Sequence, residues 1–431
     1  MNQLKNILQS PSGRSIWVIF GIGLLLRWAA FYYHYFIYQT PGGLGLSATG
    51  DEAITYDVLA HQLLDGNGFV QELFSYRPPL QPMFIALVYT ISQTTNPLVA
   101  AFCQTFVSSS IIMLAYLISG ELGASVRVRN LAGLIVAIDP ASIIISLTLM
   151  AETLSNFFIA TSLLFLVRLL KYHRTRDAIA SAAAMALATL ARPTSVYFFG
   201  FAAIPIILLV PRWPKKLLMY VSVFCIAILP WYLRNHIYNN MFTFSTVGNF
   251  DLLFYKGVSV KHWATGETPT DIEEQLAYEV DQRLGRAAPR ESYDYSSKWK
   301  FLVAKDPNTN RVITEMAIDI FRDHPATYLL VTPIHLAKIL AITYKLKMLG
   351  NIVWLELLLN VLFYITSVIG LVWGWKKRHW DWLIITVLPC VYFIAVPLLA
   401  GGTGMDTRAR TPFTPCLAIM AATGVVWTWD Y

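Results

Sequence analysis

The feature that most constrains this chain is the recurrence of long apolar stretches along its whole length. Many run for about 18 or more residues with few charges, which is the length that a helix needs to cross the hydrocarbon core of a membrane. Over the 431 residues, 56% are hydrophobic and only 14% are charged. A soluble domain is nearer half apolar and a quarter charged. We therefore expect an all-α integral membrane protein.

Short clusters of Lys and Arg between the apolar stretches set the expected orientation, because such clusters favour the cytoplasmic side. They lie before residue 16, at 127–129, 168–176, 212–216 and 376–378. Placing all of them inside gives about ten to eleven spans and puts the C-terminus inside. The expected spans are 16–38, 97–119, 131–149, 153–171, 177–192, 194–211, 216–233, 352–374, 382–400 and 412–429. The first stretch is too long for a cleavable signal peptide and is expected to be a retained span.

Two long polar segments separate these spans, and both fall on the extracytoplasmic side of the expected topology. The first polar loop covers residues 39–96, and its apolar stretch Leu80–Ile91 is too short to span, so we expect it at the membrane surface. The second polar loop, from residue 234 to about 325, has helical spacing of apolar residues over Asp271–Arg286 and Arg311–Arg322. It is expected to form a small cap. The stretch Tyr328–Tyr344, with its His and Lys, is interpreted as interfacial or re-entrant.

This pattern divides the chain into three parts. Residues 1–240 form a transmembrane module that carries the first polar loop, residues 241–325 form the cap, and residues 326–431 return to the membrane as C-terminal helices. The net charge of +7 follows from the loop cations and does not indicate a nucleic-acid partner. The four cysteines lie in apolar stretches and are expected to be unpaired. The histidines lack the spacing of metal ligands, so no metal site or cofactor is predicted, although a divalent cation stays open.

The first polar loop contains the residues best suited to chemistry. Asp51 and Glu52 follow the first span, and Arg77 precedes two prolines that restrict its backbone and fix its direction. A sugar linked to a polyprenyl phosphate has a good leaving group, which needs a cation rather than an acid. The acceptor then needs only one general base. The alternatives are structural: Asp51 as a helix cap and Arg77 as a contact to lipid headgroups.

The sequence resembles the superfamily of dolichyl-phosphate-mannose–protein mannosyltransferases, which are multi-span GT-C enzymes of the family 39 type. The resemblance rests on Asp51-Glu52-x-x-x-Tyr56 followed by Arg77-Pro78-Pro79-Leu80, and it is similar in particular to the bacterial branch of lipid A aminoarabinose transferases. Further matching elements are Met150-Ala151-Glu152-Thr153, Leu190-Ala191-Arg192-Pro193, Pro230-Trp231-Tyr232-Leu233-Arg234-Asn235 and Arg408-Ala409-Arg410-Thr411-Pro412. They cover the first 240 residues well and the last span loosely. The second polar loop has no such match.

The resemblance implies roles for individual residues. Asp51 would be the catalytic base, with Glu52 supporting it or orienting the acceptor. Arg77, Arg192, Arg408 and Arg410 would bind the donor phosphate, and Glu152 and Tyr56 would contact the sugar or acceptor. Arg77 stands where the aminoarabinose branch has a Lys, and the guanidinium fork changes the geometry of the contact. Glu152 as a helix cap and Arg192 as part of a turn are the simpler alternatives.

We thus expect an inverting glycosyltransferase that moves a hexose or pentose from a polyprenyl-phosphate donor to an acceptor in the cell envelope, which could be a glycan, a lipid or a protein. The resemblance places it in the inner (plasma) membrane with its site facing the periplasm, among membrane lipids. Two other functions remain open. An O-antigen polymerase or ligase would rely on the late second polar loop, whereas a glycolipid transporter or flippase would need paired broken helices in two related halves.

Overall fold

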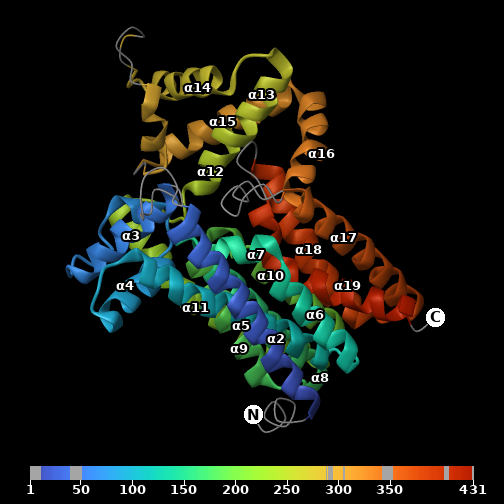
Figure 1. The fold of residues 1–431 in the computed structure, drawn as a ribbon. Helices are drawn as coiled ribbons and strands as arrows, with labels where there is room; N and C mark the ends of the chain where they lie inside the picture. The colour runs from blue at the N-terminus through green and yellow to red at the C-terminus, as the bar shows by residue number, and fades with distance from the viewer. Residues whose placement is uncertain are drawn as a thin grey trace.

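The computed structural model describes residues 11–38, 51–287, 289, 295–303, 306–341, 353–401 and 407–429. In this part of the chain all regular secondary structure is helical. Figure 1 shows long helices packed side by side in a bundle, with a group of shorter helices at one end of it. The expectation of an all-α membrane protein is confirmed.

Seven helices within the described residues are long and apolar enough to cross a membrane. The pair α6 (Val126–Ile138) and α7 (Pro140–Ser146), bent by 53°, makes an eighth if it is one broken span. The seven are α2 (Pro11–Tyr32, continued by the π-helical turn η1, Tyr33–Tyr38), α5 (Pro97–Glu121), α8 (Glu152–Tyr172), α11 (Trp213–Asn239), α17 (Val353–Lys376), α18 (Trp380–Ala400) and α19 (Thr414–Trp429, preceded by the 3₁₀ turn η9, Thr407–Phe413).

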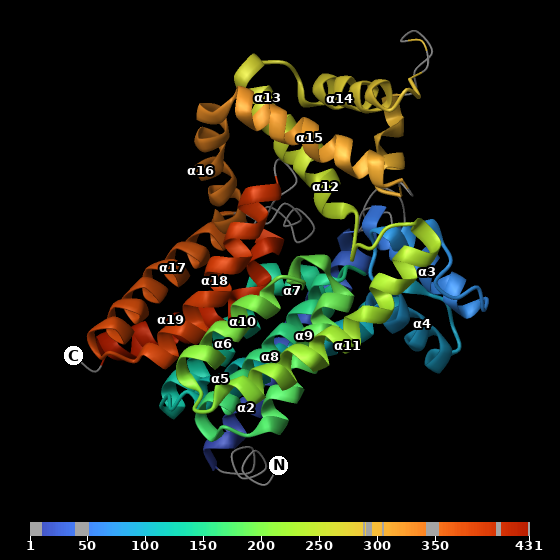
Figure 2. The ribbon, with the colours of Figure 1, turned by 180° about the vertical axis from the view of Figure 1, so that it is seen from behind.

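The expected ten spans all coincide with helical segments, but two of these are shorter than a full crossing. One is α9 (Thr175–Ala191), which has 17 residues. The other is the run from η4 (Pro193–Ser195) through α10 (Phe198–Leu209). Figure 2 shows both within the bundle, beside α8 and α11. Helices inside a bundle can be shorter than lipid-exposed ones, because neighbouring protein covers their ends.

Several helices start at a recurring local signal, a capping side chain followed by proline. Asn96, Asp139, Thr268 and Asp306 each accept a hydrogen bond from a backbone N–H in the first turn that follows. The proline after each of them takes the first helical position, where a missing N–H costs nothing. At Asp139 this signal interrupts an apolar stretch, and it produces the bend between α6 and α7.

The first polar loop folds into α3 (Asp51–Leu64), the 3₁₀ turn η3 (Glu72–Ser75) and α4 (Leu80–Ser92). Residues 39–50 of that loop lie outside the described chain. Helix α4 has 13 residues, too few to cross a membrane, as expected for the stretch Leu80–Ile91. Its Leu87 and Ile91 are exposed, which suits a helix at a lipid surface.

The second polar loop folds into a compact group of short helices, which we call the cap. It contains α12 (Val247–Asp251), the π-helical turn η5 (Leu252–Gly257), α13 (Val258–Thr265), α14 (Pro269–Arg283), the 3₁₀ turn η7 (Tyr295–Phe301) and α15 (Pro307–Asp323). Helices α14 and α15 match the two helices expected there. Buried residues such as Phe254, Leu276 and Ile313 give the cap a hydrophobic core of its own. Figure 1 shows it above the first polar loop.

Helix α16 (Pro325–Ala341) connects the cap to the C-terminal helices. It has 17 residues and is not among the candidate spans, in line with its expected interfacial position.

At the opposite end of the bundle, Arg168 of α8 lies 3.1 Å from Glu121 of α5 and 3.7 Å from Asp177 of α9. These buried contacts join three helices at the end where loop cations gather, so the two ends of the bundle differ in their chemistry.

Candidate active site

Asp51 and Glu52 are the first two residues of α3, and their side chains are outside the described part of the structure. The buried face of α3 starts with Ala53 and Tyr56. Both residues belong to the same hydrophobic cluster as Leu149 and Ala151, in the turn that leads into α8. The helix that starts with the predicted catalytic carboxylates therefore shares a hydrophobic cluster with the turn that precedes Glu152.

Arg77 lies between two aromatic rings. Its guanidinium carbon is 5.1 Å from the ring centre of Tyr56 and 4.9 Å from that of Tyr76, within the range of cation–π contact. Tyr56 is only 2% exposed, so its ring supports Arg77 and is not open to a sugar. Tyr56 follows Asp51 by five residues, about 7.5 Å along the helix axis, so Arg77 contacts α3 within two turns of its first residue. The structure thus brings two predicted site elements close together.

Glu152 and Arg192 form an ion pair, with 3.4 Å between the carboxylate Oε1 and the guanidinium. Glu152 is 3% exposed in the first turn of α8, and Arg192 directly follows α9. The helices α8 and α9 are antiparallel neighbours joined by a two-residue connection, which places the start of one beside the end of the other. Two residues predicted separately therefore act on each other, and each offsets the charge of its partner.

The two arginines of η9 are in different environments. Arg408 is half-buried, and its guanidinium is 3.9 Å from the sulfur of Met150, two residues before Glu152. Arg410 has no exposed surface and donates to Asp139 over 2.6 Å. Full burial and the ion pair with Asp139 make Arg410 less accessible to a phosphate than Arg408. Of the pair, Arg408 is the one that faces the turn at Met150–Glu152.

Asp139 was missed by the sequence analysis, although a signal for it was present. It is an ionisable residue inside the apolar stretch 131–149, and such residues within a span usually have a partner or a function. Its second carboxylate oxygen accepts from the backbone N–H of Ser142 at 3.0 Å and from the Ser142 hydroxyl at 2.5 Å. Asp139 thus caps α7 and binds Arg410 at the same time.

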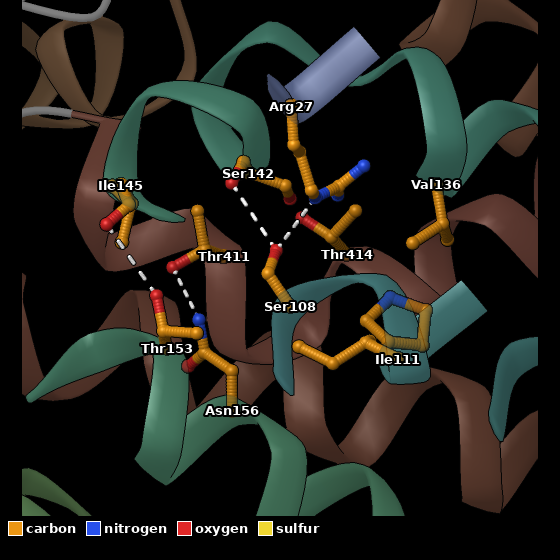
Figure 3. A pocket seen from close by; sticks show the side chains of 11 residues that line it. Arg27, Ser108, Ile111, Val136, Ser142, Ile145, Thr153, Asn156, Thr411 and Thr414 are labelled. Carbon is orange, nitrogen blue, oxygen red and sulfur yellow. Dashed lines mark hydrogen bonds between the residues drawn. The ribbon is translucent and has the colours of Figure 1, made fainter. Parts of the chain in front are cut away.

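A small cavity lies in the bundle core, lined by Arg27 and by hydroxyl and amide side chains from several helices (Figure 3). Arg27 is fully buried, and it donates to the Ser108 hydroxyl at 2.9 Å and to the backbone oxygens of Gly23 and Ala137. The cavity measures about 10 Å³, which is room for about one water. No predicted site residue lines it. It therefore serves the packing of a buried cation, as expected for an arginine in mid-span.

Within the described residues, no three or more His, Cys, Asp or Glu side chains come together as potential metal ligands. The described site residues at the cap end of the bundle are cations and a carboxylate: Arg77 before α4, Glu152 at the start of α8, Arg192 after α9 and Arg408 in η9. This composition suits a ligand that carries a phosphate and reacts with a base.

Comparison with known proteins supports the same interpretation. Residues 76–233 match the family model of dolichyl-phosphate-mannose-protein mannosyltransferases, a segment that includes Arg77, Glu152 and Arg192. No curated protein is similar enough in sequence to give a match.

Solved structures are similar over almost the whole chain. The oligosaccharyltransferase of Archaeoglobus fulgidus in its apo form has a TM-score of 0.58 at 11% identity, covering 98% of this chain and 51% of that one. The oligosaccharyltransferase AglB of the same organism, in complex with an inhibitory peptide and a dolichol-phosphate, has a TM-score of 0.57 at 13% identity over 98% and 51%. ArnT from Cupriavidus metallidurans in the apo state has a TM-score of 0.43 at 14% identity, covering 96% of this chain and 78% of that one.

The chain spans about half the length of the oligosaccharyltransferases it matches. At these identities the similarity concerns the fold, and the family model adds a sequence pattern that runs from Tyr76, before α4, into α11. Residues 76–233 thus resemble the mannosyltransferase family in sequence, and the chain as a whole is a multi-span membrane protein with a fold similar to that of the oligosaccharyltransferases.

Proposed function

We propose that this protein is an inverting glycosyltransferase that moves a sugar from a polyprenyl-phosphate donor to an acceptor outside the cytoplasm. The acceptor would be a hydroxyl or amine of a cell-envelope glycan, lipid or protein. The observation that carries the proposal is the position of Arg77 over the ring of Tyr56, because it supports the assignment of Arg77 as the phosphate-binding cation beside the helix that starts at Asp51.

The reaction assigns one task to each group. Asp51 takes the proton from the acceptor hydroxyl or amine while the oxygen or nitrogen of that acceptor group forms a bond to the anomeric carbon. The bond from that carbon to the phosphate oxygen breaks, and the electron pair leaves with the polyprenyl phosphate. Arg77 stabilises the charge that develops on this leaving group. No acid is needed to protonate it.

The residues outside the first polar loop, namely Arg408, Arg192 and Glu152, would contact the donor and acceptor from the side opposite Arg77. Arg408 is the better placed arginine of η9 for phosphate, while Arg410 is assigned to holding η9 through Asp139. Glu152 forms an ion pair with Arg192, so any contact of Glu152 with the sugar or acceptor would also involve Arg192. We therefore assign the two residues to one binding surface. Glu52 would support Asp51.

Two features of the relatives support a lipid-linked donor. The name of the matching family model specifies dolichyl-phosphate-mannose, and one structure with the same fold is described in complex with a dolichol-phosphate. A polyprenyl phosphate is a substrate that a bundle of lipid-facing helices can take up from the membrane. The helices around the site are suited to this, since the charged groups are inside and the apolar side chains are outside.

The test begins with mass spectrometry of lipids that co-purify with the protein, which identifies the donor. The purified full chain is then incubated with undecaprenyl-phosphate-linked hexoses and pentoses, and the release of undecaprenyl phosphate is measured. Asp51→Asn should reduce turnover by about a thousandfold or more, as expected for loss of a base together with its positioning. Asp271→Asn, at an exposed carboxylate of the cap, is the matched control and should keep full turnover. Near wild-type turnover in Asp51→Asn would refute the assignment.

A further inference from the structure

Arg234, at the end of α11, reaches back across the chain to the first polar loop. We infer that it is a positioning residue for Arg77, and that the start of the second polar loop holds the backbone from Phe69 to Tyr76 so that Arg77 points to the donor. This inference rests on the proposed function, in which Arg77 binds the donor phosphate.

All three nitrogens of the Arg234 guanidinium donate to protein oxygens. The Nε donates to the backbone oxygen of Phe69 at 2.7 Å and one terminal nitrogen to that of Gln71 at 2.8 Å. The other terminal nitrogen donates to the amide oxygen of Asn235 at 2.9 Å. A planar fork that reaches two backbone oxygens two residues apart fixes the conformation of that stretch, which a lysine could not do.

The surroundings of Arg234 indicate a holding role and not a ligand site. Its guanidinium carbon is 5.6 Å, 5.4 Å and 5.3 Å from the ring centres of Phe74, Trp231 and Tyr238. Among the described residues no carboxylate forms an ion pair with it. Its charge is thus balanced by carbonyl dipoles and aromatic faces, and these leave its donors occupied.

Two further contacts hold the same stretch closer to Arg77. The backbone N–H of Thr246 donates to the backbone oxygen of Ser75 at 3.2 Å. The hydroxyl of Ser245 donates to the backbone oxygen of Tyr76 at 2.9 Å. The ring of Tyr76 is itself part of the hydrophobic core of the cap. Both ends of this short turn are therefore tied to the second polar loop.

The consequence is that the end of α11 and the start of the second polar loop set the direction of a residue in the first polar loop. Arg77 follows Tyr76 directly, and its own N–H donates to the backbone oxygen of Leu73 at 3.1 Å. Its backbone is thus fixed by η3 on one side and by two prolines on the other. If Arg234 releases Phe69 and Gln71, the turn that carries Arg77 loses its support at the end nearest α11.

The test is a double-mutant cycle on the binding of undecaprenyl phosphate to the purified full chain in lipid nanodiscs. Arg77→Gln and Arg234→Gln should each raise the Kd roughly tenfold, and the double variant should raise it by no more than Arg77→Gln alone. Arg234→Lys should recover part of the loss, since an ammonium can still donate to one of the two backbone oxygens. Arg283→Gln, at an exposed ion pair in the cap, is the control and should leave Kd unchanged.

The outcomes separate the inference from the function on which it rests. An unchanged Kd in Arg77→Gln contradicts the proposed function of Arg77. If Arg77→Gln raises the Kd but Arg234→Gln does not, the positioning role of Arg234 is contradicted and the role of Arg77 is not. The same holds if the two losses of affinity add fully in the double variant. If Arg234→Gln does not fold, Ser245→Ala takes its place, because it removes a single hydroxyl, which donates to Tyr76 and accepts from the backbone N–H of Val247. It should raise the Kd about threefold in the wild-type background and cause no further rise in the Arg77→Gln background. An unchanged Kd in the wild-type background overturns the inference.

Discussion

Arg410 of η9 donates to Asp139 at the bend between α6 and α7, over 2.6 Å and across 271 residues of chain. Both side chains are buried, with 0% and 4% of their surface exposed. The pair joins the broken span to the segment that carries Arg408. It thereby connects the interior of the bundle to one edge of the proposed donor site.

The first prediction concerns this pair. Asp139→Ala should destabilise the protein by about 3 kcal/mol or more, because it leaves a buried guanidinium without its carboxylate. Thermal unfolding of the detergent-solubilised protein measures the loss. The double variant Asp139→Ala with Arg410→Met removes the isolated charge and should recover much of the stability. A single variant as stable as the wild type would show that the pair contributes nothing to folding.

The second prediction concerns the contact between α17 and α19. A Cβ atom on Gly370 would lie 1.9 Å from the backbone oxygen of Met420, and one on Gly424 would lie 2.1 Å from that of Thr366. Neither neighbour can move without shifting a helix. Gly370→Ala should therefore lower stability by about 1–3 kcal/mol, measured as a lower Tm. Gly200→Ala, in α10, meets nothing within 4 Å and is the matched control; an equal Tm in the two variants would contradict the close contact.

The third prediction concerns acid stability and His335 of α16. Its Nε2 is 2.9 Å from the hydroxyl of Ser259 and its Nδ1 is 3.3 Å from the ammonium of Lys256. Burial, with the charges of Lys256 and Lys338, lowers the pKa of His335 to about 4. Between this value and its ordinary pKa of 6.5, the unfolded chain binds a proton that the folded chain does not. Stability should therefore fall as the pH decreases from about 6.5 towards 4.

Measuring Tm between pH 4 and pH 7 tests this. In His335→Gln the part of the acid loss due to this residue should disappear, so the Tm curve should become flatter. Burial lowers the pKa of Lys256 to about 8, which leaves that group protonated in both states over most of this range. His173→Asn, at an exposed position with a left-handed backbone that Asn tolerates, should keep the wild-type slope. An unchanged slope in His335→Gln would contradict the assignment.

Much of the fold could be predicted from the sequence because lipid sets the length of a span. Each expected apolar stretch coincides with a helix, and the helices of the cap were indicated by their periodicity. The expected count was too high for full crossings because α9 and the run through α10 are each only 17 residues long, and hydropathy alone does not distinguish such a short helix from a span.

The site was predictable only in part, and the difference lies in sequence separation. Glu152 and Arg192 meet because two antiparallel helices joined by a short connection bring their ends together, which is a local consequence of the chain. Arg410 and Asp139 meet because α19 packs against α6, and no pattern in either segment specifies that contact. The support of Arg77 by Arg234 likewise depends on two loops that are distant in sequence.

The last prediction separates the two arginines of η9. Arg408 is half-buried near Met150, at the edge of the proposed site, whereas Arg410 is buried against Asp139. Arg408→Gln should therefore weaken the binding of undecaprenyl phosphate roughly tenfold, the range of one charge-assisted hydrogen bond to a phosphate, with Tm within a degree or two of the wild type. Arg410→Gln should lower the Tm sharply, and where protein remains folded its Kd should change less. Measuring the Kd and the Tm of both variants decides the assignment. Equal losses of affinity at equal Tm would contradict it, because both arginines would then reach the phosphate and Asp139 would release Arg410 when the donor binds.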